Sequence, residues 1–139
     1  MFEYKNQVLT ALESSGECSM GGIDLDQRLF TYFSHVLRKK HRFNPLLDPQ
    51  DQLTLRLAVS AIKTHFYYDV QSRHAKIGHL DVTFSNGKRI RESITQSVFE
   101  EICRDMVDRL RVHCTTALSC LLGTRYNIQH VILTGSCSR

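Results

Sequence analysis

The feature that most constrains this fold is the dipeptide Asn86-Gly87, which lies between two segments rich in hydrophobic residues. Segment 77–84 precedes it, and Ile90 and Ile94 follow it. Asn-Gly tolerates positive φ at both central positions of a two-residue turn, so the pattern predicts an antiparallel β-hairpin that turns at these two residues. Any fold proposed for the chain has to include this hairpin.

Two segments before the hairpin repeat their hydrophobic residues every three or four positions, as helices do. The first helix is expected over about 24–43, with a glycine pair and carboxylates at its start and the basic run Arg38–Arg42 at its end, where the helix dipole favours cations. The second is expected from Pro49, capped by Asp48, to about 66–68. Each helix therefore has its own start signal.

A third helix is expected after the hairpin. It should begin near residues 95–97, where Ser97 and Glu100 have the spacing of a capping box, and stop at Gly123. Its hydrophobic residues recur on one side, which predicts that this side is buried. The predicted buried set is Phe99, Ile102, Cys103, Met106, Leu110, Cys114, Ala117, Leu118 and Leu121.

Strands are expected at both ends of the chain. Residues 1–14 contain two short hydrophobic segments separated by the polar break Lys5–Gln7, which indicates a second hairpin. Segment His130–Thr134 is too hydrophobic for an exposed edge and is expected to form a buried strand. Three main helices, two β-hairpins and a terminal strand give a predicted α+β fold class.

Composition places the chain among ordinary globular domains. It has 139 residues, 42% of them hydrophobic and 23% charged, and a formal net charge of +4 that is spread along the sequence. No segment approaches the roughly 18 hydrophobic residues of a membrane-spanning helix, and the first residues lack the layout of a signal peptide. We therefore expect a cytoplasmic chain with no membrane partner.

Cysteine and histidine patterns do not indicate a metal or catalytic site. The five cysteines form no C-x-x-C pair, which predicts reduced thiols, and the seven histidines form no H-E-x-x-H motif. The sequence also lacks a Cys–His catalytic pair, a G-x-S-x-G elbow and a Walker A loop. No catalytic residue and no metal ligand are therefore predicted.

Two glycine-containing turns could contact a ligand. Gly21-Gly22 precedes a helix start, where backbone N–H groups can bind phosphate, although a tight turn explains an isolated glycine pair more simply. Gly135-Ser136 follows the expected terminal strand and either lets a ligand lie against the backbone or simply ends the strand. Both alternatives stay open for each turn.

Three basic features are further candidates. Lys63 lies among hydrophobic residues on the second helix, where it either reaches a polar ligand or extends its amine into solvent. Arg139 offers a planar guanidinium that can stack on a base. Arg38–Arg42 could bind phosphates or an acidic partner, but a basic helix end usually complements the dipole, and no aromatic residues interleave to stack bases. Nucleic acid is therefore not the expected partner.

The order of these parts resembles the second lobe of the nucleotide-binding domain of the seventy-kilodalton heat-shock chaperones, the DnaK-like members of the actin-like ATPases. Three segments carry the resemblance, with the sequences G-G-I-D-L-D-Q-R at 21–28, I-T-Q-S-V-F-E-E at 94–101 and V-I-L-T-G-S-C-S-R at 131–139. Together they span nearly the whole chain.

This resemblance implies a fold and a set of partners. The chain would be a single fragment, lobe II of the domain, with a helix-and-hairpin subdomain at about 24–95 and part of an actin-like layered subdomain at 1–23 and 96–139. Nucleotide-exchange factors and co-chaperones would be its partners, and unfolded client proteins would bind only through other domains.

The resemblance also implies half of an ATP or ADP site, with Mg²⁺, in the complete domain. The family's first lobe and catalytic loops have no match in this sequence, so the chain alone is not expected to hydrolyse ATP, which requires charge stabilisation from both sides of the phosphates. The implied nucleotide contacts are Gly21 and Gly22 at the phosphates, Lys63 at the ribose, Gly135 and Ser136 beneath the adenosine, and Arg139 on the adenine.

Four positions differ from the family pattern. Ser60 replaces a glutamate to the ribose, Thr64 an arginine over the base, Tyr67 a serine and Ser136 a glycine. Each lost contact typically costs ~1–3 kcal/mol. These differences favour a second hypothesis, a stand-alone interaction module that binds chaperones or co-chaperones without nucleotide.

Overall fold

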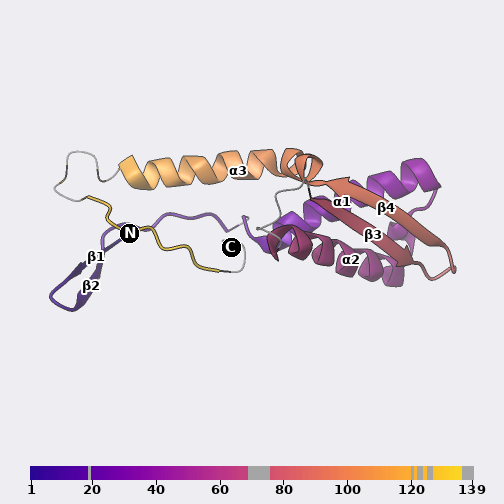
Figure 1. Cartoon of the computed structure of the whole chain (residues 1–139), viewed down its shortest axis with the longest axis horizontal. Coiled ribbons are helices and arrows are strands. Elements are labelled where there is room, and N and C mark those ends of the chain that lie inside the picture. Colours follow the sequence, from indigo (N-terminus) through magenta and orange to yellow (C-terminus); the bar gives the residue numbers. More distant parts are fainter. Residues whose placement is uncertain (19, 69–75, 120, 122–123, 125–126, 136–139) are drawn as a thin grey trace. The chain divides into compact units, whose positions relative to one another are not determined.

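The computed structural model of the chain describes residues 1–18, 20–68, 76–119, 121, 124 and 127–135 (Figure 1). These residues contain three α helices and two small antiparallel sheets, which confirms the predicted α+β class. They divide into two units that we describe separately. Unit 1 combines Met1–Met20 with Asp105–Leu133, and unit 2 contains Gly21–Arg104 with the residues from Thr134 onward.

Helix α1 (Gly22–His41) begins two residues before its expected start. Gly21 is the N-cap residue, and its N–H donates a hydrogen bond to the Asp24 carboxylate at 2.7 Å. The helix ends where Arg42 adopts a left-handed conformation with φ of +50°. Four basic residues occupy the last turn, where they complement the negative end of the dipole as predicted.

Helix α2 (Pro49–Tyr68) follows a short 3₁₀ helix, η1 (Pro45–Leu47). The Gln50 N–H donates to the Asp48 carboxylate at 2.7 Å, which confirms Asp48 as the cap of α2. One side of the helix enters the core through Leu55, Val59, Ile62 and Phe66.

Strands β3 (Ile77–Thr83) and β4 (Arg89–Thr95) form the predicted antiparallel hairpin. Its turn differs from the expected one, because Gly87 has a φ of +78° whereas Asn86 has no positive φ. The Gly87 N–H donates to the Phe84 carbonyl at 2.9 Å, so a type I turn is followed by a left-handed glycine. Asp51 helps to fix this loop, since its carboxylate accepts a hydrogen bond from the Ser85 N–H at 2.7 Å.

The core of unit 2 lies between the β3–β4 hairpin and helices α1 and α2, which run beside it in Figure 1. Every second residue of β3 is buried against these helices, as the period of a half-buried strand requires. The least exposed side chains are Leu29, Phe33 and Leu37 of α1, Leu55 and Val59 of α2, and Leu80, Ile90 and Ile94 of the hairpin.

Helix α3 (Gln96–Ser119) is capped by Thr95 and not by Ser97. The Val98 N–H donates to Thr95 Oγ1 at 3.4 Å. The expected capping box of Ser97 and Glu100 is wrong, because Ser97 already lies in the first turn, where its hydroxyl bonds that of Thr95 at 3.0 Å. Gly123, the expected stop, lies outside the described residues.

The predicted buried side of α3 is confirmed only in the first half of the helix. Cys103 and Met106 are buried, and Phe99 and Ile102 pack against the core. By contrast Leu110, Cys114 and Leu118 are exposed, and the buried residues of the main hydrophobic cluster in the described part of the chain all belong to unit 2.

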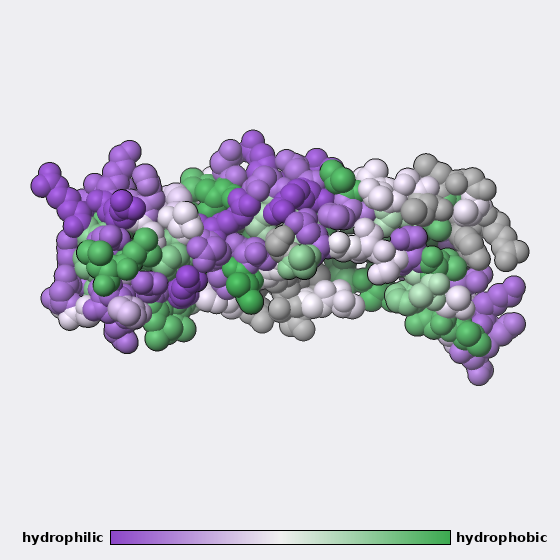
Figure 2. All heavy atoms as spheres, turned by 180° about the vertical axis from the view of Figure 1, so that it is seen from behind, coloured by the Kyte–Doolittle hydropathy of each residue, from purple (hydrophilic) through white to green (hydrophobic). Residues whose placement is uncertain are grey.

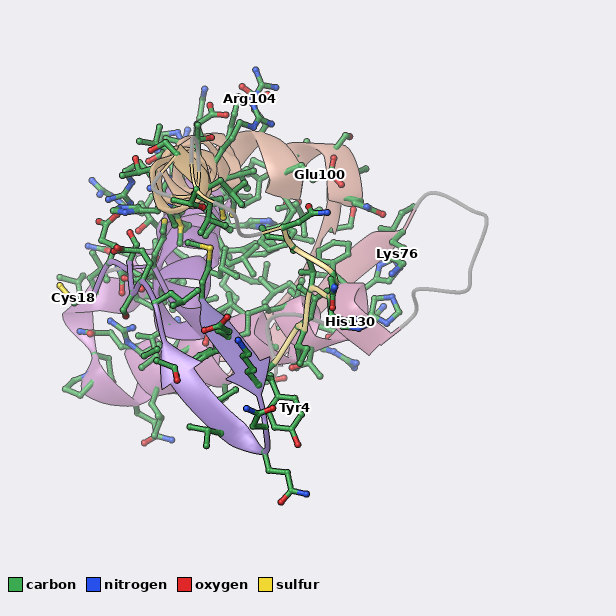
Figure 3. The ribbon with its side chains drawn as sticks, turned by 90° about the vertical axis from the view of Figure 1, so that its left-hand side faces the viewer. Tyr4, Cys18, Lys76, Glu100, Arg104 and His130 are labelled. Carbon is green, nitrogen blue, oxygen red and sulfur yellow. The ribbon has the colours of Figure 1, made fainter. Side chains whose placement is uncertain are left out.

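Unit 1 contains the predicted N-terminal hairpin of β1 (Phe2–Lys5) and β2 (Val8–Ala11). Asn6 and Gln7 form its turn with φ of +51° and +64°. Most of its side chains are exposed, and Tyr4 projects from the ribbon in Figure 3. In the same unit, Glu17 forms an ion pair with Arg109 of α3 at 2.6 Å.

The prediction of a terminal strand at His130–Thr134 is wrong. These residues have no regular secondary structure, and Val131, Ile132 and Leu133 are 73–82% exposed. A strand needs a neighbour to bind its backbone N–H and C=O groups, and within the described residues each hairpin pairs only with itself. None of the described helices is both long and hydrophobic enough to cross a membrane.

Candidate functional site

The start of α1 brings together the candidate residues of the first two helices. Lys63, on α2, donates hydrogen bonds to the Gly22 carbonyl at 3.0 Å and to the Asp26 carboxylate at 2.7 Å. The lysine is held there because the two helices pack along each other. The structure thus places Lys63 next to Gly22, which lies 41 residues earlier in the chain. Spacing along the sequence does not reveal this contact.

Burial strengthens this ion pair. The side chains of Lys63 and Asp26 are 14% and 24% exposed, so water screens their attraction less than at an open surface. From its position in the sequence, Asp26 is expected only as a possible helix cap, and its role as the partner of Lys63 is not predicted. A signal for the pairing did exist, because α1 contains only two carboxylates, Asp24 and Asp26, and Asp24 caps the helix.

One oxygen of Asp26 has no partner among the described residues. Oδ2 binds Lys63, whereas Oδ1 is buried without a hydrogen bond. A buried acceptor without a donor costs about 1–3 kcal/mol, which a bound water or ligand hydroxyl would recover. An ammonium also carries three donors, of which Lys63 uses two here. The corner therefore has one acceptor and one donor that are not used within the described residues.

Of the other candidate residues, the structure describes Gly135 only. Gly135 has a φ of +89°, a left-handed conformation that favours glycine, and a Cβ at this position would meet no atom within 4 Å. Ser136 and Arg139 lie outside the described residues. Among the predicted site residues that the structure describes, Lys63 therefore contacts Gly22, and Gly21 is the N-cap residue next to it.

Two of the four divergent positions are visible on α2. Thr64 Oγ1 donates to the Ser60 carbonyl of its own helix at 2.9 Å. A hydroxyl bonded in this way is short and turned toward its own backbone, unlike the long guanidinium that the family has there. The Tyr67 side chain and Ser136 lie outside the described part of the chain.

A sequence model of the Hsp70 protein family matches residues 1–139 of this chain. The chain belongs to the Hsp70 family. This match confirms the resemblance inferred from the order of motifs, and the chain corresponds to a fragment of the Hsp70 nucleotide-binding domain. Members of the family bind ATP or ADP with Mg²⁺ and interact with co-chaperones and nucleotide-exchange factors.

Relatives of the Hsp70 family match the chain from end to end. It is 29% identical to the chaperone protein dnaK of Cyanophora paradoxa, 27% identical to the chloroplastic heat shock 70 kDa protein 7 of Arabidopsis thaliana, and 25% identical to the chaperone protein DnaK of Thermosipho melanesiensis. Each match covers 100% of this chain but 22%, 19% and 23% of the relative. The chain therefore spans about a fifth of the length of these Hsp70 proteins.

At the other end of α1, two residues of the basic run Arg38–Arg42 form ion pairs with Glu92 of β4. His41 and Lys40 bind the Glu92 carboxylate at 2.8 and 3.0 Å. Burial raises the pKa of Glu92, but the hydrogen bonds from His41 and Lys40 outweigh it, and the net pKa lies below its usual value. The run therefore fastens α1 to the hairpin.

Proposed function

We propose that this chain contributes one side of an adenine-nucleotide site in an Hsp70-type chaperone, as the part of the domain called lobe II. The observation that carries the proposal is the corner formed by Gly22, Asp26 and Lys63, where a lysine and an unpartnered carboxylate oxygen meet at a helix start. Such a corner offers N–H donors, a cation and an acceptor to a sugar and its phosphates.

Within this proposal each group has a separate task. The α1 start would face the phosphates with its backbone N–H groups, and Lys63 would donate to a ribose oxygen through the N–H that Asp26 and Gly22 leave unused. Asp26 Oδ1 would accept from a hydroxyl or from a water of hydration. A bound Mg²⁺ would neutralise phosphate charge, and surfaces of the same lobe would receive exchange factors and co-chaperones.

We expect binding without hydrolysis. Phosphoryl transfer depends on groups that clamp the phosphates from both sides and orient the attacking water. The proposed corner supplies one side only. A phosphate-release assay on the isolated chain should therefore give no turnover above a protein-free control.

Isothermal titration of the full 139-residue chain with Mg-ADP tests the nucleotide proposal. Binding should weaken by roughly tenfold in Lys63→Met, the value for a lost charged hydrogen bond, and stay unchanged in Lys39→Met on the exposed end of α1. Circular dichroism of Lys63→Met would show whether the helices persist. No heat with millimolar Mg-ADP, or equal binding by both variants, would refute the proposal.

A second candidate function is an interaction module that binds chaperones or co-chaperones without nucleotide. Thr64 favours it, because its hydroxyl is bonded to its own helix and cannot act as the family's arginine does. This function predicts that Mg-ADP produces no heat while a purified Hsp70 or exchange factor binds the chain. Failure to bind either protein in the same titration would remove it.

A further inference from the structure

The β3–β4 hairpin has an outer face, opposite the side that packs on helices α1 and α2. Alternate residues of both strands are exposed on this face, and of these eight residues only Ile77 is hydrophobic. Other parts of the surface are mixed, since Figure 2 shows hydrophobic patches between hydrophilic side chains at the end formed by α1, α2 and the hairpin, on the left of the view. The outer face is therefore suited to a polar or charged ligand.

Two arginines of β4 bind one aspartate of β3 on this outer face. Arg89 donates through Nε to Asp81 Oδ1 and through Nη2 to Oδ2, both at 2.7 Å. Arg91 donates through Nε to Oδ2 of the same carboxylate at 3.1 Å. The register explains this arrangement, because Asp81 lies directly opposite Arg91 and diagonally opposite Arg89. We call Arg89 and Arg91 the arginine pair.

The arginine pair carries more positive charge than the hairpin neutralises. Segment 77–95 contains two carboxylates, Asp81 and Glu92, and Glu92 forms its ion pairs with helix α1. Hydrogen bonds from Arg89 and then Arg91 lower the pKa of Asp81 to about 2 despite some opposing desolvation, so Asp81 carries one negative charge at neutral pH. The two guanidiniums and this carboxylate together keep one positive charge.

Most N–H groups of the arginine pair are available to a ligand. A guanidinium has five N–H donors, of which Arg89 uses two and Arg91 uses one on Asp81, so three and four remain without a partner among the described residues. The two side chains are 58% and 69% exposed. Because Asp81 already holds both guanidiniums in place, an anion that binds them would restrict few additional side-chain torsions.

We propose that the arginine pair binds the phosphate group of a phosphate monoester. A monoester has three terminal oxygens and up to two negative charges, so each guanidinium can donate two N–H groups to it. A carboxylate or a phosphate diester has only two free oxygens, which a single guanidinium occupies. The phosphate would lie on the side of the arginine pair away from Asp81, where the unused donors are and the repulsion from this carboxylate is weakest.

The neighbouring cross-strand pair adds two polar groups to the proposed site. His79 lies opposite Ser93, two residues along each strand from Asp81 and Arg91, and therefore on the same outer face. The Ser93 hydroxyl and an imidazole N–H of His79 are donors that a bound phosphate could also use. The site lies on the hairpin and does not depend on nucleotide binding at the corner of Gly22, Asp26 and Lys63.

A titration of the full ¹⁵N-labelled chain with glycerol 3-phosphate tests the proposal. The Nε–H signals of Arg89 and Arg91 should shift and saturate at millimolar ligand. Dimethyl phosphate, a diester with one charge, should bind several-fold more weakly at the same ionic strength. Arg91→Gln should weaken the binding of glycerol 3-phosphate by about tenfold, the value for one lost charged hydrogen bond, while Arg89 still binds Asp81.

Arg104→Gln is the matched control for Arg91→Gln. Both changes remove one positive charge, and the Arg104 side chain on α3 is 68% exposed, almost the same as that of Arg91. This variant should bind glycerol 3-phosphate as the unchanged chain does, and so should Lys63→Met, which separates the site from the nucleotide corner. Equal affinity for the diester, or an equal loss in Arg104→Gln, would overturn the proposal.

The phosphate monoester could be a soluble metabolite or a lipid headgroup, and vesicle binding distinguishes the two sources. Saturable binding of glycerol 3-phosphate with no preference for phosphatidic acid vesicles over phosphatidylglycerol vesicles would assign the site to soluble monoesters. Binding to phosphatidic acid vesicles alone, lost in Arg91→Gln, would assign it to a lipid headgroup. No binding to either form of the monoester would overturn the proposal.

Discussion

Gly78 sets how closely β3 approaches α2. A Cβ at this position would lie 2.5 Å from Ile62 Cγ2 and 3.1 Å from the Phe66 ring. We expect Gly78→Ala to lower the free energy of unfolding by about 1–3 kcal/mol, the usual cost of overpacking a core. Urea denaturation followed by circular dichroism measures this difference.

Gly16→Ala is the control for Gly78→Ala. A Cβ at Gly16 would meet no atom within 4 Å, and its φ is not in the left-handed region. The change should therefore alter stability by less than about 0.5 kcal/mol. Equal destabilisation by the two alanines would show that helix α2 does not approach β3 at Gly78.

Asp81 should titrate at unusually low pH. Hydrogen bonds from Arg89, at 2.7 Å, and then Arg91 lower the pKa of this carboxyl to about 2 despite some opposing desolvation. Because the folded pKa lies below the unfolded value of about 3.9, the charged pair stabilises the fold above pH ~4, and this contribution disappears as the pH falls toward 2.

The pKa of Asp81 can be followed by the chemical shift of its carboxyl carbon in an NMR titration. In Arg89→Gln it should move back toward the ordinary aspartate value, because the largest cause of the shift is removed. Arg104→Gln, on α3, is the control, since Arg104 pairs with Glu101; its side chain projects from the ribbon in Figure 3. An Asp81 pKa near 4 in the unchanged chain would contradict the geometry.

At this scale the sequence identifies residue types better than their partners. Gly21, Gly22 and Lys63 are recognisable as candidates from motifs, but the ion pair of Lys63 with Asp26 depends on how two helices pack. The sequence does not reveal the role of Gly78. A glycine inside a strand can mark a close approach of another element, but that element is known only from the structure, where it is α2.

At the scale of elements, the structure and the sequence pattern give different N-cap residues for α3, Thr95 in the structure and Ser97 in the sequence pattern. Thr95→Ala removes the acceptor of the Val98 N–H and should cost about 1 kcal/mol, the usual value of an N-cap. Ser97→Ala removes a hydroxyl inside the first turn and should cost a few tenths. Chemical denaturation measures the loss of unfolding free energy in each variant. A larger loss in Ser97→Ala than in Thr95→Ala would instead support the capping box.

Elements with strong local signals were predictable, and their ends were less so. Asp48-Pro49 fixes the start of α2 because cap and first helical residue are both specified by sequence. Asn86-Gly87 located the hairpin correctly, but the turn type also depends on Asp51, which lies on another helix and binds Ser85. Local propensity cannot include such a contact, so the three-residue loop was missed.

At the scale of the whole molecule, unit 2 contains the buried core, whereas unit 1 has many exposed hydrophobic residues. The terminal segment 131–133 was predicted to be buried because its composition is that of a core strand. A hydrophobic composition shows only that a segment can be buried. A strand is buried when it also has a neighbouring strand, and the described residues provide none for this segment. The same reasoning explains why the second half of α3 is exposed.

Hydrogen exchange should therefore separate the two units. A two-stranded hairpin without a covering layer is marginally stable, so amides that pair β1 with β2, such as those near Tyr4 and Leu9, should exchange almost as fast as in an unfolded peptide. Amides of α2 and of the β3–β4 hairpin should exchange only through global opening, because their side chains form the core. Mass spectrometry of peptic fragments after timed exchange measures both. Equal protection in the two hairpins would contradict this prediction, because it would mean that unit 1 is stabilised by contacts as extensive as those of unit 2.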